Sequence, residues 1–308
     1  MISDHGLNRF SVSDANNEAN VGILLKVQQL DRRYIYALVF VLVAIPILVP
    51  FVPPLNVGPQ AQSFYDVIEK APKDKVIFFA TDFSGGVLGE NKPQCVAVME
   101  HVMRRGLKFI IFSLDSQGAD YGHEIAQDLA RQYPDYKKYG EKWVNFGFKY
   151  TTDDTLPGTL QALGNGFRGI VKKDKLGSDL DQIPMMKGLH DFTQVAALCE
   201  FTGSGTYEFW VRYLCGAKKI TMLTGCTGII GPRIYPYLDS GQMSGLLNGM
   251  KGAAEYEKLL GHWGPGKMRR GGRGMNSQSL GAILIITLIL LGNMSMLAEK
   301  RQSAAGGS

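Results

Sequence analysis

The sequence predicts an α/β fold: a Rossmann-like, three-layer domain with a mostly parallel sheet, flanked by two transmembrane helices. Uncharged apolar stretches at 34–52 and 280–298 are each about 19 residues long, enough for a helix to cross a hydrocarbon core of about 30 Å. Between them, short apolar runs alternate with segments of helical periodicity. That alternation is typical of βαβ units, whose strands are buried on both faces.

These patterns divide the 308 residues into six segments. They are a polar N-terminal tail with a short interfacial helix (1–33), the first transmembrane helix (34–53), the α/β globular domain (54–263), a basic Gly/Arg linker (264–279), the second transmembrane helix (280–298) and a C-terminal tail (299–308). The first span is not a cleavable signal peptide, because a long tail precedes it and Pro53-Pro54 follows it in place of a small-residue cleavage site.

Within the domain, each expected strand is an apolar run that ends in a small or polar turn. The expected strands are 76–80, 107–114, 143–148, 194–201 and 219–223. Helical periodicity or composition predicts helices at 93–105, 121–133, 155–163, 179–186 and 207–214. A last helical stretch, from about 234 to 260, closes the domain.

The charges around the two spans give conflicting evidence on orientation. Arg32 and Arg33 precede the first span, and Lys300 and Arg301 follow the second. These favour cytoplasmic termini and an extracytoplasmic domain. The basic segment KMRRGGR at 267–273, on the domain side of the second span, favours the reverse. Because the first helix usually dominates, we expect a two-pass cell-membrane protein with its domain outside. The four cysteines have no CxxC spacing and mildly favour a reducing compartment.

The candidate site lies in the turns that follow the strands. In an open parallel sheet, ligands bind beyond the carboxyl ends of the strands, near a switch in strand order. Glycine, serine and threonine in such turns offer backbone N–H groups and hydroxyls to an anion. The alternative is that these turns need glycine and helix N-caps in any case. The candidate ligand-binding residues are Asp82, Ser84, Gly85, Asp115, Ser116, Thr202, Gly203, Ser204, Gly205, Thr224, Cys226 and Thr227.

Two catalytic alternatives arise from the same turns. Cys226 stands at a strand-to-helix turn, where a helix N-terminus can lower the pKa of a thiol, and His123 or His190 is a candidate base. Asp82 and Asp115 end the first two strands, so they can raise each other's pKa or hold a divalent cation. A structural cysteine and two N-caps are the simpler alternatives.

Other classes of site lack a signature. The loop at 202–206 has neither a GxGxxG nor a Walker sequence, and no His/Cys spacing of a metal site occurs. The cofactor and the substrate therefore stay open. The net charge of +5 gathers beside the spans without an aromatic-interleaved basic stripe, so no nucleic-acid partner is expected. The expected partners are the lipid bilayer and either a membrane protein or a small molecule.

Short segments spread over most of the chain also carry a family resemblance. They are Leu30-Asp31-Arg32-Arg33, Met186-Lys187-Gly188, Gly225-Cys226-Thr227, Tyr235-Pro236-Tyr237-Leu238, Ser240-Gly241-Gln242 and Gly252-Ala253-Ala254-Glu255-Tyr256. On these segments the chain resembles an uncharacterised family of bacterial membrane proteins with two terminal transmembrane helices flanking an α/β domain. The resemblance implies a membrane location and no activity. The basic segment at 267–273 departs from the family pattern.

Three functions remain open at this point. The chain is either a membrane-tethered ligand- or partner-binding module, a scaffold subunit of a membrane complex, or a membrane-anchored hydrolase that uses Cys226 or an Asp82/Asp115 site. We favour the binding or scaffold function, because no catalytic signature in the sequence is strong.

Labelling with an impermeant reagent tests the expected orientation. A Ser178→Cys variant, in a background with the native cysteines replaced, is expected to react with a membrane-impermeant maleimide in intact cells, because the domain then faces outward. Labelling that appears only after lysis would place the domain in the cytoplasm.

Overall fold

The computed structural model describes residues 31–49 and 51–305, so most of the expected N-terminal tail and its interfacial helix lies outside the described residues. The chain divides into two units. One unit contains the segment that ends at Phe51 together with the segment that starts at Asn276, and the other is Val52–Met275.

The second unit contains a six-stranded, all-parallel sheet in the order β3-β2-β1-β4-β5-β6. Its strands are β1 (Val76–Asp82), β2 (Lys108–Ser113), β3 (Trp143–Phe148), β4 (Val195–Thr202), β5 (Met222–Cys226) and β6 (Gly245–Asn248). The expected α/β fold with a parallel sheet is therefore confirmed. The strand order reverses between β1 and β4, which makes their carboxyl ends the switch point of the sheet.

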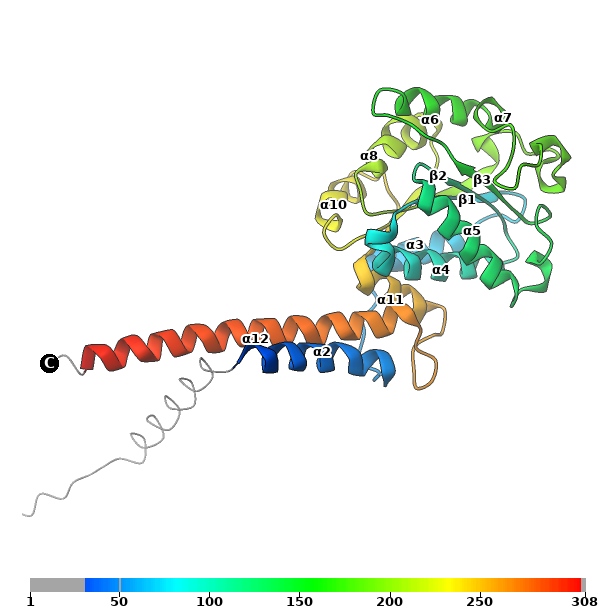
Figure 1. Ribbon diagram of the computed structural model, residues 1–308. Helices are drawn as coiled ribbons and strands as arrows, with labels where there is room; N and C mark the ends of the chain where they lie inside the picture. The colour runs from blue at the N-terminus through cyan, green and yellow to red at the C-terminus, as the bar shows by residue number, and fades with distance from the viewer. Residues whose placement is uncertain (1–30, 50, 306–308) are drawn as a thin grey trace, which may run out of the picture. The chain divides into compact units, whose positions relative to one another are not determined.

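Helices cover both faces of this sheet (Figure 1). The helices of one layer are α3 (Pro59–Glu69), α4 (Leu88–Arg104), α5 (Ser116–Ala130) and α11 (Gly249–Leu259). The helices of the other layer are α6 (Leu156–Asn165), α7 (Phe167–Ile170), α8 (Thr206–Trp210) and α10 (Gly231–Asp239). A π-helix, Val211–Cys215, and the short α9 (Gly216–Lys218) continue α8.

Each face of the sheet has its own apolar core, because successive side chains of a strand point to opposite faces. In β1, whose seven residues are all buried, Phe78 packs with Trp210 in one core, whereas Phe79 packs with Phe201 in the other. Full burial of one such side chain contributes about 1.5–3 kcal/mol, so two-sided burial accounts for the near-continuous apolar runs of the strands.

Two of the expected helices differ from the structure. The stretch from about 234 to 260 is not one helix, since it holds α10, β6 and α11. Gly241 and Gly249, with φ of 73° and 58°, interrupt the helical conformation on either side of β6. A Cβ at Gly245 would lie 2.6 Å from Cα of Phe64, so β6 needs glycine for α3 to pack on it. The expected helix at 179–186 consists of two 3-10 turns, Leu180–Gln182 and Pro184–Met186.

The first unit contains α2 (Arg32–Leu48) and most of α12 (Arg270–Ala305). Within the described residues, one helix is long and apolar enough to cross a membrane: Arg270–Leu297 of α12. One of the two expected spans is thus found. The other, expected at 34–53, is a helix of 17 residues with Pro46 inside it.

The two helices of this unit run antiparallel. The Asn276 side chain donates a hydrogen bond to the Phe51 carbonyl (2.7 Å), and a Cβ on Gly281 would touch Val43. The later residue of α12, Gly281, thus lies beside the earlier residue of the N-terminal segment, Val43. This order of contacts is that of an antiparallel helical hairpin.

The expected linker at 264–279 also differs from the structure, because α12 already begins at Arg270. Its first turn is held by the α/β domain. The Glu257 carboxylate of α11 accepts the N–H groups of Gly271 (2.8 Å) and Gly272 (2.9 Å). Arg269 is paired with Glu100 of α4 at 2.7 Å. The domain therefore continues beyond 263, to about Met275.

A pair of fragments tests this boundary. The fragment 52–263 lacks Arg269, Gly271 and Gly272, so it leaves Glu257 without these bonds and removes one cation from buried Glu100. We expect the fragment 52–275 to exceed it in free energy of unfolding by about 2–4 kcal/mol, measured by urea denaturation. Equal stability of the two fragments would show that 264–275 is a linker after all.

Candidate functional site

Two buried carboxyl groups, those of Asp82 in β1 and Glu200 in β4, lie on neighbouring strands at the switch point. In the register of the sheet, Ala80 of β1 lies beside Glu200 of β4, and Asp82 beside Thr202. Since side chains alternate, Asp82 and Glu200 project from the same face, toward the layer of α8. Asp82 is 4% exposed and Glu200 is fully buried. The sequence pattern indicated Asp82 but not Glu200, because Glu200 lies inside an apolar run.

The Asp82 carboxylate connects three elements. Its Oδ1 accepts the backbone N–H of Leu114 (2.7 Å), at the end of β2, and its Oδ2 accepts the indole N–H of Trp210 (2.7 Å), in α8. Burial raises the pKa of Asp82 to about 6 in spite of these bonds, and the charge of Asp115 adds to the rise. The buried Asp82 side chain thus links β1 to the end of β2 and to α8 through hydrogen bonds.

Glu200 is only partly satisfied. Its Oε1 accepts a hydrogen bond from the Thr206 hydroxyl (2.8 Å), whereas its Oε2 is buried without a partner in the described part of the chain. Burial, followed by the charge of Asp82, raises the pKa of Glu200 well above its usual value and so favours the neutral carboxyl. From Thr206, contacts between hydroxyls lead to Thr202 (2.8 Å) and on to the exposed Ser204 (3.2 Å).

The start of α4 fills the crevice beyond these strands. A Cβ on Gly203 would lie 2.6 Å from Val87, so the turns after β1 and β4 are in close contact. Two fully buried amides of α4 then bind the strand ends. Asn91 donates to the carbonyls of Thr202 (3.2 Å) and Gly225 (3.3 Å), and Gln94 donates to those of Cys226 (2.9 Å), Leu247 (3.2 Å) and Gly249 (2.8 Å).

The second predicted carboxylate, Asp115, has a local role. Its Oδ1 accepts the N–H groups of Gln117 (2.8 Å) and Gly118 (3.0 Å), so it caps the N-terminus of α5. That bond is the N-cap alternative considered from the sequence. Ser116 is the exposed first residue of α5.

The remaining predicted residues lie in three turns, except Thr224, which the structure places inside β5. The Gly85 N–H donates to the Gln117 side chain (2.7 Å), with Ser84 just before it. Thr227 donates its N–H to the Thr202 carbonyl (3.3 Å), whereas the buried Thr224 hydroxyl lies 3.5 Å from the Met243 sulfur. Gly205 is exposed just before α8. The structure thus joins the β1, β4 and β5 turns through internal contacts.

The geometry around Cys226 is that of a structural thiol. The side chain is fully buried, and burial, with the charges of Glu200 and Glu90, raises its pKa to about 12. Activation of a thiol requires the opposite shift. Neither candidate base bonds to Cys226 in the described residues: His123 packs against Tyr139 and Trp143, and His190 is exposed.

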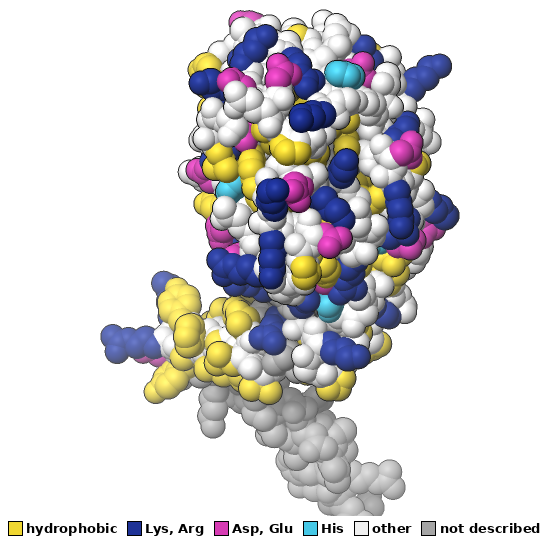
Figure 2. All heavy atoms as spheres, turned by 90° about the vertical axis from the view of Figure 1, so that its right-hand side faces the viewer, with side chains coloured by type: hydrophobic (Ala, Val, Ile, Leu, Met, Phe, Trp, Pro, Cys, Tyr) yellow, Lys and Arg dark blue, Asp and Glu magenta, His cyan; other side chains and the backbone are white. Residues whose placement is uncertain are grey.

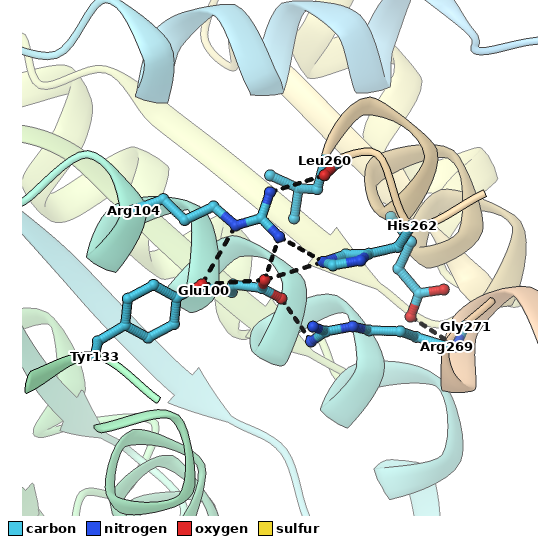
Figure 3. A network of polar contacts seen from close by, with 8 residues as sticks. Glu100, Arg104, Tyr133, Leu260, His262, Arg269 and Gly271 are labelled. Carbon is cyan, nitrogen blue, oxygen red and sulfur yellow. Dashed lines mark hydrogen bonds and ion pairs between the residues drawn. The ribbon is translucent and has the colours of Figure 1, made fainter. Parts of the chain in front are cut away.

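A second polar site, which the sequence did not indicate, lies at the other end of α4 (Figure 3). Glu100, whose side chain is 2% exposed, pairs through Oε1 with Arg104 and His262 and through Oε2 with Arg269. Burial alone would raise the pKa of Glu100, but the His262 hydrogen bond and the charges of Arg104 and Arg269 hold it below the usual value. The cluster therefore contains a stable buried carboxylate.

Next to this cluster is a pocket of about 450 Å³ between α4, α5, α11 and the start of α12. Its cationic lining is Lys92, Arg269, Arg270 and Arg273. Its apolar lining is Pro93, Val96, Ile125, Leu129 and Met268. The volume lies within the range of about 300–1,000 Å³ of ligand pockets. The sequence signal for this pocket is the basic segment at 267–273, which was interpreted above as a signal for membrane topology.

Comparisons with known proteins do not assign either site. No family model matches the chain, and no curated protein matches it. The resemblance to a family of two-anchor membrane proteins therefore stays a prediction.

The Glu200→Gln variant tests the buried acid pair. An acid whose folded pKa is raised contributes stability that is complete below its unfolded pKa, near 4.5 for Glu200, and lost as the pH rises through the folded value. We therefore expect wild type and Glu200→Gln to be similarly stable at pH 5, with the variant gaining relative to wild type as the pH rises to 9. Urea denaturation of the fragment 52–275 measures this difference.

The exposed neighbour Glu208 provides the control. Glu208→Gln should show the pH dependence of the wild type. If Glu200→Gln instead lost stability at every pH, Glu200 would be ionised and paired in the folded state.

Proposed function

We propose that this protein is a membrane-tethered α/β module that binds a ligand or partner, or acts as a scaffold, and that it has no catalytic activity of its own. The observation that carries the proposal is the closure of the switch-point crevice by α4. Asn91 bonds the end of β4 at the switch point, where this fold normally receives a ligand, and Val87 packs against Gly203 in the turn after β4. Gln94 holds the neighbouring ends of β5 and β6.

The state of the candidate catalytic groups supports this proposal over the hydrolase alternative. The Cys226 thiol is buried with a raised pKa, the Asp82 carboxylate is bonded to Leu114 and Trp210, and Asp115 caps α5. A nucleophile or general base must reach a substrate atom, and these groups are committed to bonds within the domain.

The surfaces of α2 and α12 support a tether of two spans. Their large apolar side chains are exposed, with Phe40 at 74% and Leu48 at 78% in α2 and Ile283 at 59% in α12. Hydrophobic side chains gather over these helices, whereas acidic and basic side chains are interspersed over the domain (Figure 2). With 17 residues, α2 is about 26 Å long, which is a few ångströms shorter than a hydrocarbon core of about 30 Å. Local thinning of the bilayer, or extension of the Arg32 and Arg33 side chains to the interface, can accommodate this difference.

The proposed orientation has cytoplasmic termini and an extracytoplasmic domain. An antiparallel hairpin directs both chain ends to one side, so Arg32, Arg33 and Lys300 act together as cytoplasmic signals. The opposing basic segment at 267–273 counts for less than its sequence implies, because Arg269 is paired with Glu100.

Alkylation of Cys226 tests the closed crevice. In the fragment 52–275, iodoacetamide is expected to modify Cys226 only as fast as it modifies Cys95, another fully buried thiol, because both are reached through unfolding. Gln94→Ala removes three bonds to strand-end carbonyls and should speed the modification of Cys226 by about tenfold or more.

Gln182→Ala is the matched control, because Gln182 is an exposed amide on a distant 3-10 turn. It should leave the rate unchanged. Rapid modification of Cys226 in the folded wild-type fragment would overturn the proposal and favour the hydrolase alternative.

A further inference from the structure

We propose that the pocket between α4, α5, α11 and the start of α12 binds the phosphodiester headgroup of an anionic phospholipid. The inference rests on the proposed membrane anchoring through α12. It does not depend on the closed crevice, because the crevice is filled by Asn91 and Gln94, which do not line the pocket.

The charge on the pocket wall is incompletely balanced within the domain. Lys92 is paired with Glu124 at 2.9 Å, and Arg269 with Glu100 at 2.7 Å. Arg270 is exposed, and its side chain has no ion pair or hydrogen bond among the described residues. A guanidinium of this kind recognises a phosphate through two parallel hydrogen bonds.

The acidic groups of the wall do not cancel this charge. Glu257 faces the backbone N–H groups of Gly271 and Gly272, and burial raises its pKa. Asp128 lies 3.4 Å from Arg131 in an exposed ion pair. Glu257 also occupies the N-terminus of α12, so the proposed ligand contacts side chains and not the end of the helix.

The rest of the wall suits a lipid better than a free anion. Ile125, Leu129 and Met268 are buried side chains that offer apolar surface beside the arginines. A phosphate ion cannot use that surface, whereas the glycerol and first acyl carbons of a phospholipid can.

The position of the arginines in α12 also matches a headgroup. Arg273 precedes the apolar stretch that begins at Leu280 by seven residues of the same helix, which is about 10 Å. The headgroup layer is about 5–8 Å thick on each side of the hydrocarbon core, and arginine stems extend toward it. Basic residues at this depth attract anionic lipids.

Lipid retention by the full chain tests the site. The protein, extracted in a non-ionic detergent, is titrated with phosphatidylglycerol or phosphatidylcholine, and bound lipid is counted by native mass spectrometry. We expect phosphatidylglycerol to bind at least about tenfold more tightly. Arg270→Gln should weaken phosphatidylglycerol binding by about tenfold, because it removes the charge-assisted hydrogen bonds to the phosphate. Val96→Phe places a larger side chain on the apolar side of the pocket and reduces its volume, so it should also weaken lipid binding.

Lys267→Gln is the matched control, since Lys267 is an exposed cation of the same segment outside the pocket wall. An equal loss in Lys267→Gln and Arg270→Gln would overturn the pocket in favour of diffuse attraction. Equal binding of the two lipids would overturn headgroup recognition. Displacement of the lipid by equimolar glycerol phosphate would identify a free phosphate ester as the ligand and overturn the lipid. Recovery of the chain without detergent would overturn the anchoring itself.

Discussion

The side-chain amide of Gln94 is the interaction on which the arrangement of the strand ends depends. One buried NH₂ group donates to carbonyls at the ends of β5 and β6 and at the start of α11, three segments that no other single side chain joins in the described hydrogen bonds. Asn91, one turn earlier, does the same for β4 and β5. Unpaired buried carbonyls are costly, so the edge of the sheet and the first half of α4 stabilise each other.

The second half of α4 has a corresponding role at the other end of the helix. Glu100 joins α4 to His262 and Arg269, and thereby to the segment that leads into α12. A buried carboxylate with three cationic or potentially cationic partners is well compensated, whereas loss of one partner exposes it to the full cost of burial. One helix therefore closes the crevice of the sheet and attaches the start of the C-terminal helix to the domain.

The layer architecture was predictable because both-sided burial leaves a strong pattern in the sequence: the apolar runs of β1, β2, β3 and β4 all appear in the expected places. The strand expected at 219–223 lies three residues further on, as β5, so Thr224 and Cys226 belong to the strand and not to the turn after it. The short β6 was not predicted, because four residues give no periodicity and the contact of Gly245 with Phe64 leaves no local signal in the sequence.

The candidate site was less predictable, for a reason that concerns partners and not composition. The sequence indicated that Asp82, Asp115 and Cys226 lie near strand ends, but it could not show that Trp210 and Leu114 satisfy Asp82 or that Glu200 lies near it. The Glu100 cluster joins residues more than 160 positions apart, such as Glu100 and Arg269, so no local motif marks it.

The capping of α12 by Glu257 has a consequence for biogenesis. A helix normally takes its cap from the residues just before it, but here the carboxylate comes from α11, fourteen residues before Gly271. The first turn of α12 can therefore become ordered only once α11 has packed into the domain. Order at the start of α12 is in this way coupled to the folding of the domain that precedes it: in a chain whose domain is misfolded, α12 begins with a frayed turn.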